Sequence, residues 1–317
     1  MNGTTKNIVF LILSTIAGAA MMWWIYRGFD VHTLAEFFGQ RSNYVWIILA
    51  LAAGVLANVL RALRWRMLLE SADIHISRRR SVELIFISYL INSVTPRLGE
   101  LTRSLLVQRG NSAVSTRALG TVVVEKLADV GCLLVVIALA VSLRWQNTVD
   151  LVQRMSEGLT LALPSYTFYV VIGCVVCLLV GLSFPLWRHI RRFLVNLWEG
   201  ITAILRLRSP LSFCTLCVGI WVCNFLQLYL LLPCYEVLTH LSLADLIHVF
   251  AAASVGVLLP TPAGAGPWHF AIVKTLTTVY HTTKGVAQSF ALISHGLKTA
   301  LVMLLGVLEN TNNFLTV

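Results

Sequence analysis

Runs of apolar residues that approach membrane-spanning length constrain this chain more than any other feature. A helix that crosses about 30 Å of hydrocarbon needs about 20 consecutive, mostly apolar residues. Six such spans are predicted, at residues 7–26, 44–63, 118–142, 167–187, 211–232 and 286–308. Composition agrees, because 57% of the residues are hydrophobic and only 12% are charged, whereas soluble domains carry about 25% charged residues. We therefore expect an all-α integral membrane protein, with residues 1–317 forming a single membrane domain.

Two further apolar stretches, 82–95 and 246–260, are too short to cross a membrane comfortably. Each runs into a break rich in Pro and Gly, at 95–100 and 261–267, and a short amphipathic stretch follows, at 98–109 and 267–280. Irregular backbone at membrane depth survives only when it is buried in protein or lines a wet cavity. The pattern therefore predicts two re-entrant, broken-helix hairpins, 82–109 and 246–280, in addition to the six spans.

The distribution of positive charge supports this topology. If both hairpins return to their starting side, 16 of the Lys and Arg residues fall on one side of the membrane and 6 on the other. The cationic excess belongs in the cytoplasm, so both termini and the loops 64–81 and 188–209 are expected on the cytoplasmic side of a bacterial inner membrane. The net charge of +10 then attracts anionic lipid heads. Nucleic acid is not an expected partner, because the chain has no basic domain interleaved with aromatic residues.

The two broken segments also resemble an internal repeat. One half would span about 44–142 and the other about 211–308, with helices 7–26 and 167–187 as additions. Because the chain crosses three times between 44–63 and 211–232, the halves would have opposite orientations. Inverted repeats of this kind place a transporter's binding site near the membrane midplane. The alternative is that Pro/Gly pairs recur by chance.

Ionisable residues within the expected spans are candidates for function. Glu125 and Asp129 share one helix face, and so do His295 and Lys298. A central charge costs about 2.5–3.5 kcal/mol on insertion scales, so such residues normally face a partner or a cavity. We expect Glu125 and Asp129 to point inward, within reach of Lys298 or of a wet cavity. A purely structural ion pair is the alternative.

The breaks themselves suggest an anion site. Thr95-Pro96 and Thr261-Pro262 each place a candidate N-cap hydroxyl before a proline suited to the first helical position. The free N–H groups of the helix that follows would attract an anion such as phosphate. Arg97 and Arg103 would add to this attraction, while Glu100 opposes it unless Arg103 neutralises it. The alternative is a helix kink that neighbouring residues fill.

Enzyme and metal signatures are missing from the sequence. It contains no GxSxG elbow, no HExxH and no P-loop. The pairs Cys174-x-x-Cys177 and Cys214-x-x-Cys217 lie within or beside apolar spans and have no nearby His or carboxylate to complete a zinc site. We therefore expect neither a cofactor nor a metal.

Three ordered motifs resemble the lysylphosphatidylglycerol synthase transmembrane, or flippase-like, family, the membrane half of the multiple peptide resistance factor. The motifs are Asn92-x-x-x-Pro96-Arg97-x-Gly99-Glu100-x-x-Arg103, Glu125-Lys126-x-x-Asp129, and Pro260-Thr261-Pro262-Ala263-Gly264-Ala265-Gly266. The resemblance covers nearly the whole chain and implies a lipid-translocating domain with two re-entrant regions. This sequence departs from the family at Ala263, where Gly is usual, and at His269, where Glu is frequent. The cytosolic aminoacyltransferase domain of the resistance factor has no counterpart in the sequence.

The leading hypothesis is a translocator for a phospholipid or lipid-linked amphiphile. Its partner would be a membrane lipid with an anionic, aminoacylated or polyprenyl-linked head, and a second copy of the chain or a separate enzyme are further candidates. A membrane-embedded headgroup transferase that uses Glu125 or Asp129 as a base is the alternative, as is a non-catalytic partner of a glycosyl- or aminoacyltransferase. The candidate substrate-binding residues are Asn92, Pro96, Arg97, Gly99, Glu100, Arg103, Glu125, Asp129, Pro262, Gly264, Gly266, His269, His295 and Lys298.

Overall fold

The described part of the chain is helical throughout. The computed structural model describes residues 3–95, 98–108, 111–160, 202 and 206–315, and no strand occurs among them. The α-helices are α1 (Gly3–Tyr26), α2 (His32–Gly39), α3 (Asn43–Ser71), α4 (Arg78–Val94), α5 (Leu98–Leu106), α6 (Ser112–Leu143), α7 (Trp145–Thr160), α10 (Pro210–Tyr229), α11 (Leu243–Gly256), α12 (Pro267–Thr278) and α13 (Lys284–Leu315). Short 3₁₀ turns are η2 (Leu232–Cys234), η3 (Glu236–Leu238) and η4 (Pro262–Gly264).

Three segments of the described chain are long and apolar enough to cross a membrane: Asn43–Ser71, Pro210–Cys234 and Lys284–Glu309. They correspond to the predicted spans 44–63, 211–232 and 286–308. The predicted span 118–142 lies in α6, which has 32 residues but carries several charges. The span 167–187 lies outside the described residues. The number of six crossings therefore stays a prediction.

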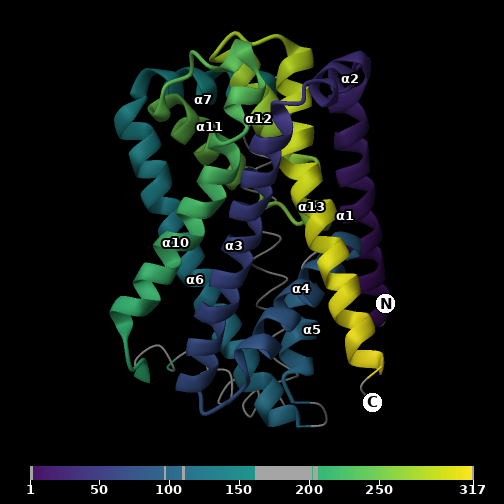
Figure 1. The fold of residues 1–317 in the computed structure, drawn as a ribbon, viewed down its shortest axis with the longest axis vertical. Coiled ribbons are helices and arrows are strands. Elements are labelled where there is room, and N and C mark those ends of the chain that lie inside the picture. The colour runs from purple at the N-terminus through teal and green to yellow at the C-terminus, as the bar shows by residue number, and fades with distance from the viewer. Residues whose placement is uncertain (1–2, 96–97, 109–110, 161–201, 203–205, 316–317) are drawn as a thin grey trace.

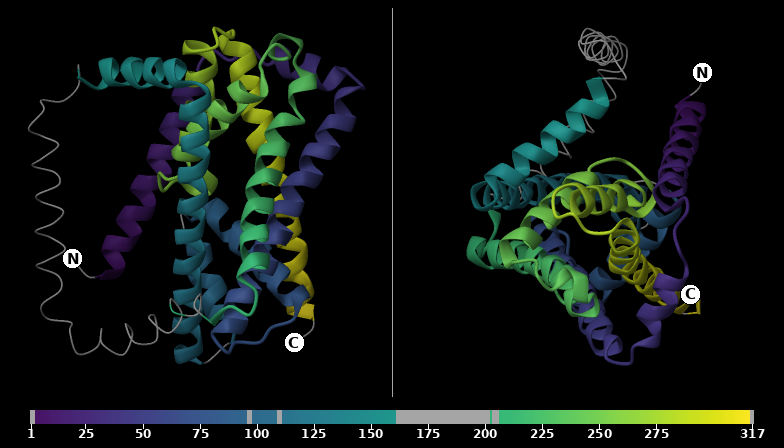
Figure 2. Two further views of the ribbon diagram at one scale, coloured as in Figure 1. Left: turned by 90° about the vertical axis from the view of Figure 1, so that its left-hand side faces the viewer. Right: turned by 90° about the horizontal axis from the view of Figure 1, so that it is seen from above.

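The long helices form a bundle, and the short helices lie in pairs toward its two ends (Figure 1). The pair α4 and α5 lies toward one end, and the pair α11 and α12 lies toward the other. The helix α7 runs sideways out of the bundle from the end of α6 (Figure 2). The order long, short, short, long occurs twice, first in α3 to α6 and then in α10 to α13.

The two breaks differ from the expected capping pattern. The Thr95 hydroxyl donates back to the carbonyl of Ile91, and the first turn of α5 is capped instead by Asn92, whose Oδ1 accepts from the Gly99 amide (2.8 Å). Thr261 makes no side-chain cap. The prediction that these threonines cap the following helices was therefore wrong. At the first break Asn92, one turn before Thr95, reaches the Gly99 amide instead.

At the second break the following short helix does not begin directly after Thr261. Residues Pro262–Gly264 form only a 3₁₀ turn, and α12 starts at Pro267. Gly266 precedes it with φ 92°, a left-handed backbone conformation that glycine adopts without steric cost. Pro267 occupies an early helical position, where its missing N–H would have been unpaired anyway.

Small residues allow the helices of each pair to pack closely. Gly99 of α5 lies directly against the Ser88 carbonyl of α4, and a Cβ at Gly256 of α11 would lie 2.7 Å from the Pro267 carbonyl oxygen of α12. Between apolar helices in lipid, such close packing replaces the hydrophobic effect as the source of association. Large aliphatic side chains such as Ile48 and Leu134 face outward and are well exposed, as lipid contact requires.

We expect Gly99→Ala to destabilise the first helix pair. The added methyl would overlap the Ser88 carbonyl, a backbone atom that cannot rotate away. Overpacking of this kind costs about 1–3 kcal/mol, which thermal unfolding in detergent would detect as a lower Tm. Gly131→Ala is the matched control, because a Cβ at Gly131 of α6 meets no atom within 4 Å. Equal melting of the two variants would contradict the tight crossing of α4 and α5.

Candidate functional site

A cluster of charged side chains is buried where α3, α5 and α6 meet. Arg64, Arg103 and Glu125 are 0%, 2% and 1% exposed. Arg103 donates from Nη2 to Glu125 Oε2 (3.0 Å). The other carboxylate oxygen, Oε1, lies 3.7 Å from both Arg61 Nη1 and Arg64 Nη2. A single carboxylate thus faces three guanidinium groups.

Asp129 lies one helical turn beyond Glu125 on α6 and completes the cluster. Its Oδ2 accepts from Arg61 Nη1 (2.9 Å), and its Oδ1 lies 2.8 Å from Arg64 Nη1. Arg64 also donates to the Cys217 sulfur of α10 (3.4 Å). Since three arginines face two carboxylates, the cluster carries one excess positive charge.

Within the described part of the chain, four buried guanidinium nitrogens of this cluster make no hydrogen bond: Arg61 Nε, Arg64 Nε, Arg64 Nη2 and Arg103 Nε. Two carboxylate oxygens, Glu125 Oε1 and Asp129 Oδ1, are satisfied by ion pairs alone, so the unused donors outnumber the unused acceptors by four to two. A buried donor without a partner costs about 1–3 kcal/mol, and more when it is charged. The cluster therefore has both spare positive charge and spare donors, which is the combination that attracts an oxyanion.

Sequence reasoning missed Arg61 and Arg64, which it assigned to the edge of a basic loop. In fact α3 continues to Ser71, so both arginines lie on the helix and point into the protein. The helix can continue because Glu125 and Asp129 compensate their charge. The i,i+3 spacing of Arg61 and Arg64 matches the i,i+4 spacing of the two carboxylates, and this was the signal available in the sequence.

Glu100 does not pair with Arg103. It accepts from Lys126 (2.9 Å) and from Asn92 Nδ2 (3.1 Å). Asn92 therefore holds both the Gly99 amide and the Glu100 carboxylate, which fixes the start of α5. Pro96 and Arg97, two other candidate residues at this break, lie outside the described residues.

Trp65 covers the cluster from α3. Its ring lies 4.4 Å from the Arg103 guanidinium carbon, and its Nε1 donates to Thr121 Oγ1 (3.1 Å). The Trp65 side chain is completely buried. A desolvated cation–π contact of this kind is worth about 2 kcal/mol, so Trp65 holds Arg103 in position for Glu125.

Lys298 does not pair with Glu125 or Asp129. Its Nζ donates to Asn224 Oδ1 of α10 (2.8 Å), and no ion pair to it occurs in the described part of the chain. Its aliphatic stem packs near Gly54 of α3. Lys298 is therefore a second interior cation, two helical turns along α3 from Arg61.

A polar strip on α3 connects these two cations. Gly54, Asn58, Arg61 and Trp65 follow the i, i+4, i+7, i+11 spacing of one helix face. Asn58 is buried, and no described residue accepts a hydrogen bond from its Nδ2. The strip faces the interior of the bundle and leads from the charge cluster to Lys298.

His295, one turn before Lys298, connects the strip to the second break. Its Nε2 lies 3.0 Å from the Ala263 carbonyl oxygen of η4, and its ring centroid lies 4.9 Å from that of His269. Of the other candidates here, Pro262 and Gly264 form η4, and Gly266 precedes α12. Because α4 also contacts η4, the two breaks lie near each other inside the bundle.

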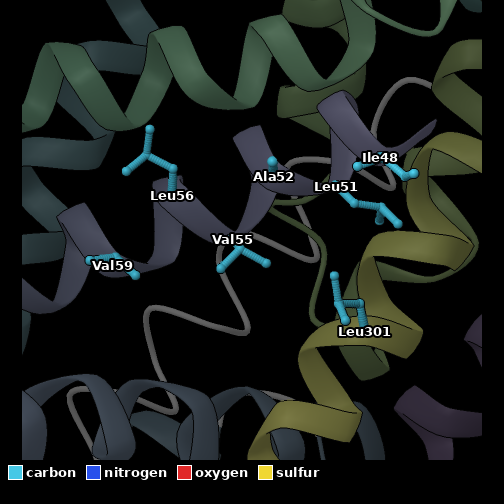
Figure 3. Close-up of a pocket in the computed structure, with 7 residues that line it drawn as sticks. All are labelled: Ile48, Leu51, Ala52, Val55, Leu56, Val59 and Leu301. Atoms are coloured by element: carbon cyan, nitrogen blue, oxygen red, sulfur yellow. The ribbon is translucent and has the colours of Figure 1, made fainter. Parts of the chain in front are cut away.

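The outer surface of α3 carries a groove of a different character. Seven aliphatic residues line this open pocket of about 520 Å³, and Leu301 of α13 faces α3 across it (Figure 3). At 3.6 residues per turn, Ile48, Val55 and Val59 fall on the face of α3 opposite Arg61. The groove has no polar group for a lipid head, so the candidate site is the interior cluster and its strip.

Comparison with known proteins agrees with the resemblance that the motifs predicted. Over 129 residues, 39% of this chain, the sequence is 23% identical to a UPF0104 membrane protein from Pyrococcus horikoshii, and the match covers 37% of that protein. No solved structure matches. The family model for the lysylphosphatidylglycerol synthase TM region matches residues 9–306. With its membrane-spanning helices, this chain is a multi-pass membrane protein that belongs to the lysylphosphatidylglycerol synthase TM region family.

Proposed function

We propose that this protein translocates a phospholipid or lipid-linked amphiphile between membrane leaflets and binds the phosphate of its head at the charge cluster. The observation that carries the proposal is the buried excess of arginine over carboxylate beside the first break. A lipid phosphate supplies both the missing negative charge and oxygen acceptors for the orphan guanidinium nitrogens. Family membership supports a role that involves membrane lipids.

The partly exposed edge of the cluster offers an entrance for such a head. Arg61 and Asp129 are 15% and 19% exposed, in contrast to the completely covered Arg64. An arriving phosphate would meet Arg61 first and would displace part of its contact with Asp129. It would then pair with a guanidinium group, whose planar fork matches phosphate geometry.

The arrangement of the two broken helix pairs supports a path rather than a single binding site. We infer that each pair enters and leaves the membrane on one side, and that the pairs belong to two inverted halves of the chain. The polar strip on α3 leads from the cluster toward the second break, and Gly54 lies about 10 Å from Arg61 along the helix. Such a strip would let a charged head pass while its acyl chains stay in lipid.

A headgroup transferase is the less favoured function. A general base must accept a proton, but guanidinium groups surround Glu125 and Asp129. Each of their four carboxylate oxygens already lies 2.8–3.7 Å from a guanidinium nitrogen, so a substrate proton would have to compete with these ion pairs. Electrostatic binding therefore fits these residues better than proton abstraction.

Transport in proteoliposomes would test the function. The protein would be reconstituted with a fluorescent phosphatidylglycerol, and dithionite would report the rate at which the outer leaflet gains or loses the probe. We expect Arg61→Gln to slow transfer about 10- to 100-fold, because a hydrogen bond to a charged group is worth about 1.5–3 kcal/mol. Arg61 is the best position to change, because it is the least buried of the three arginines.

The matched control is Arg79→Gln. Arg79 is 78% exposed and pairs only locally with Glu83 on α4, so transfer should continue at the wild-type rate. Wild-type protein that transfers the probe no faster than protein-free vesicles would overturn the proposed function. Equal rates in Arg61→Gln and wild-type protein would show instead that the cluster is structural and that the head passes elsewhere.

A further inference from the structure

The second break carries polar groups that the charge cluster does not explain. Thr261 Oγ1, Trp268 Nε1 and His269 Nε2 are buried, and none of them has a hydrogen-bond partner among the residues that the structure describes. Trp268 and His269 are neighbours in the first turn of α12, and both of their rings contact His295. His295 in turn contacts η4, which begins next to Thr261. Three buried polar groups without a hydrogen-bond partner therefore lie around the segment from Thr261 to the first turn of α12.

The hydrogen bonds of the two histidines assign their protons. The Gly266 amide points at His269 Nδ1 (3.4 Å), so Nδ1 is the acceptor and the ring proton lies on Nε2. His295 Nε2 faces the Ala263 carbonyl oxygen and therefore carries a proton as well. Hence His269 Nε2 is an unpaired donor, as the indole nitrogen of Trp268 must be.

The charge around this break is positive. Lys298 lies on the same face of α13 as His295, one turn away, and its one acceptor in the described ranges is the neutral side chain of Asn224. In the described part of the chain, no carboxylate forms an ion pair or hydrogen bond with Lys298, His269, His295 or Trp268. The first break is different, because there Glu100 and Asp129 are both partly exposed.

The helix α1 covers this set of donors. Gly18 packs against Thr261, and Met21 packs against Gly266. Tyr26 contacts the His269 ring at 5.7 Å and donates from its hydroxyl to the Gln288 carbonyl oxygen of α13. α1 therefore screens this side of the break from the surrounding lipid, while Trp268 and His269 contact His295 of α13.

We propose that the second break binds an anionic lipid head that carries no ammonium group, and that it discriminates against amino- and aminoacyl-lipids. This inference rests on the proposed function and names the substrate class of that path. A phosphate with hydroxyl groups offers the acceptors that Thr261, Trp268 and His269 need, and its charge pairs with Lys298. An ammonium group would meet Lys298 and a set of donors with no carboxylate to hold it, which is unfavourable in an interior of low dielectric constant.

Head selectivity would be measured by native mass spectrometry of the protein in nanodiscs that contain equal amounts of dioleoyl phosphatidylglycerol and its lysyl ester. We expect the wild-type protein to retain about tenfold more phosphatidylglycerol than lysyl ester. His269→Glu introduces a carboxylate beside His295 and should remove or reverse this preference. His240→Glu introduces the same charge at an exposed position in the loop before α11, outside this set of donors, and is the matched control, which should keep the wild-type preference.

Trp268→Phe tests the donor set separately, because it removes the indole N–H and keeps an aromatic ring. It should lower phosphatidylglycerol retention about threefold to tenfold with little change in Tm. Equal retention of both lipids by the wild type would overturn the inference, as would an unchanged ratio in a folded His269→Glu variant. If that variant does not fold, Trp268→Phe and Lys298→Met decide, and full phosphatidylglycerol retention by both would overturn it.

The two measurements give different results if the translocation function fails and if the head selectivity fails. Retention is measured without transport, so a selective protein that transfers no fluorescent lipid would remove the translocation role and leave this binding site. A protein that transfers lipid but retains both heads equally would remove the selectivity and leave the translocation role. The two measurements therefore separate the two proposals.

Discussion

Replacing Glu125 by glutamine is expected to lower the free energy of unfolding by about 3–5 kcal/mol, the usual cost of removing one partner from a buried ion pair. Glutamine keeps the shape of the side chain but leaves Arg61, Arg64 and Arg103 with Asp129 as their only carboxylate in the cluster. Arg103 would be affected most, because it would lose the charged acceptor of its Nη2 group. Thermal unfolding in detergent would show the loss as a large fall in Tm and in the yield of folded protein.

Two further variants distinguish charge imbalance from general disruption. Glu36→Gln changes an exposed carboxylate on α2 and should leave the free energy of unfolding within about 0.5 kcal/mol of the wild-type value. Adding Arg103→Met to Glu125→Gln removes the stranded guanidinium and should recover part of the lost stability. A Glu125→Gln protein that melts at the wild-type temperature would show that water or lipid already compensates the cluster.

The sequence pattern predicted the helical class and the positions of both breaks. Runs of aliphatic residues are a direct consequence of lipid contact, so α3, α10 and α13 were visible without tertiary information. The breaks at Thr95 and Thr261 were visible for an equally local reason, since proline and glycine interrupt the helical hydrogen-bond pattern. The inward direction of Glu125 and Asp129 followed from the cost of charge in hydrocarbon.

The partners within the site could not be predicted in the same way. The positions of Glu125 and Asp129 within an apolar span indicate that each carboxylate needs a cation nearby. Which cation it is depends on how α6 packs against the other helices. Lys298 seemed the natural partner because it lies mid-span, yet the packing of α3 against α6 brings Arg61 and Arg64 to Asp129 instead. The position of Trp65 over Arg103 depends on the same crossing, and no spacing in the sequence encodes it.

Trp65→Ala is expected to be the most damaging substitution that leaves every charge of the cluster in place. Replacing a fully buried tryptophan by alanine costs about 3–5 kcal/mol through lost contacts and the cavity that remains. Here it also removes the ring over the Arg103 guanidinium and the hydrogen bond to Thr121. We expect a large fall in Tm in detergent, together with slower lipid transfer, because Arg103 would no longer be held toward Glu125.

Two milder variants separate the roles of the Trp65 side chain. Thr121→Val removes the acceptor of the indole N–H together with the bond that the Thr121 hydroxyl donates to the Ala118 carbonyl oxygen (2.7 Å). It should cost about 1 kcal/mol, with lipid transfer unchanged. Trp65→Phe loses the same hydrogen bond but keeps an aromatic ring near Arg103, so its transfer rate should stay closer to the wild type than that of Trp65→Ala. If Trp65→Phe and Trp65→Ala slow transfer equally while differing in Tm, the indole itself rather than the ring over Arg103 would be what the path requires. If the Trp65→Ala variant has the wild-type Tm and the wild-type rate of lipid transfer, the close packing of Trp65 against the charge cluster would be contradicted.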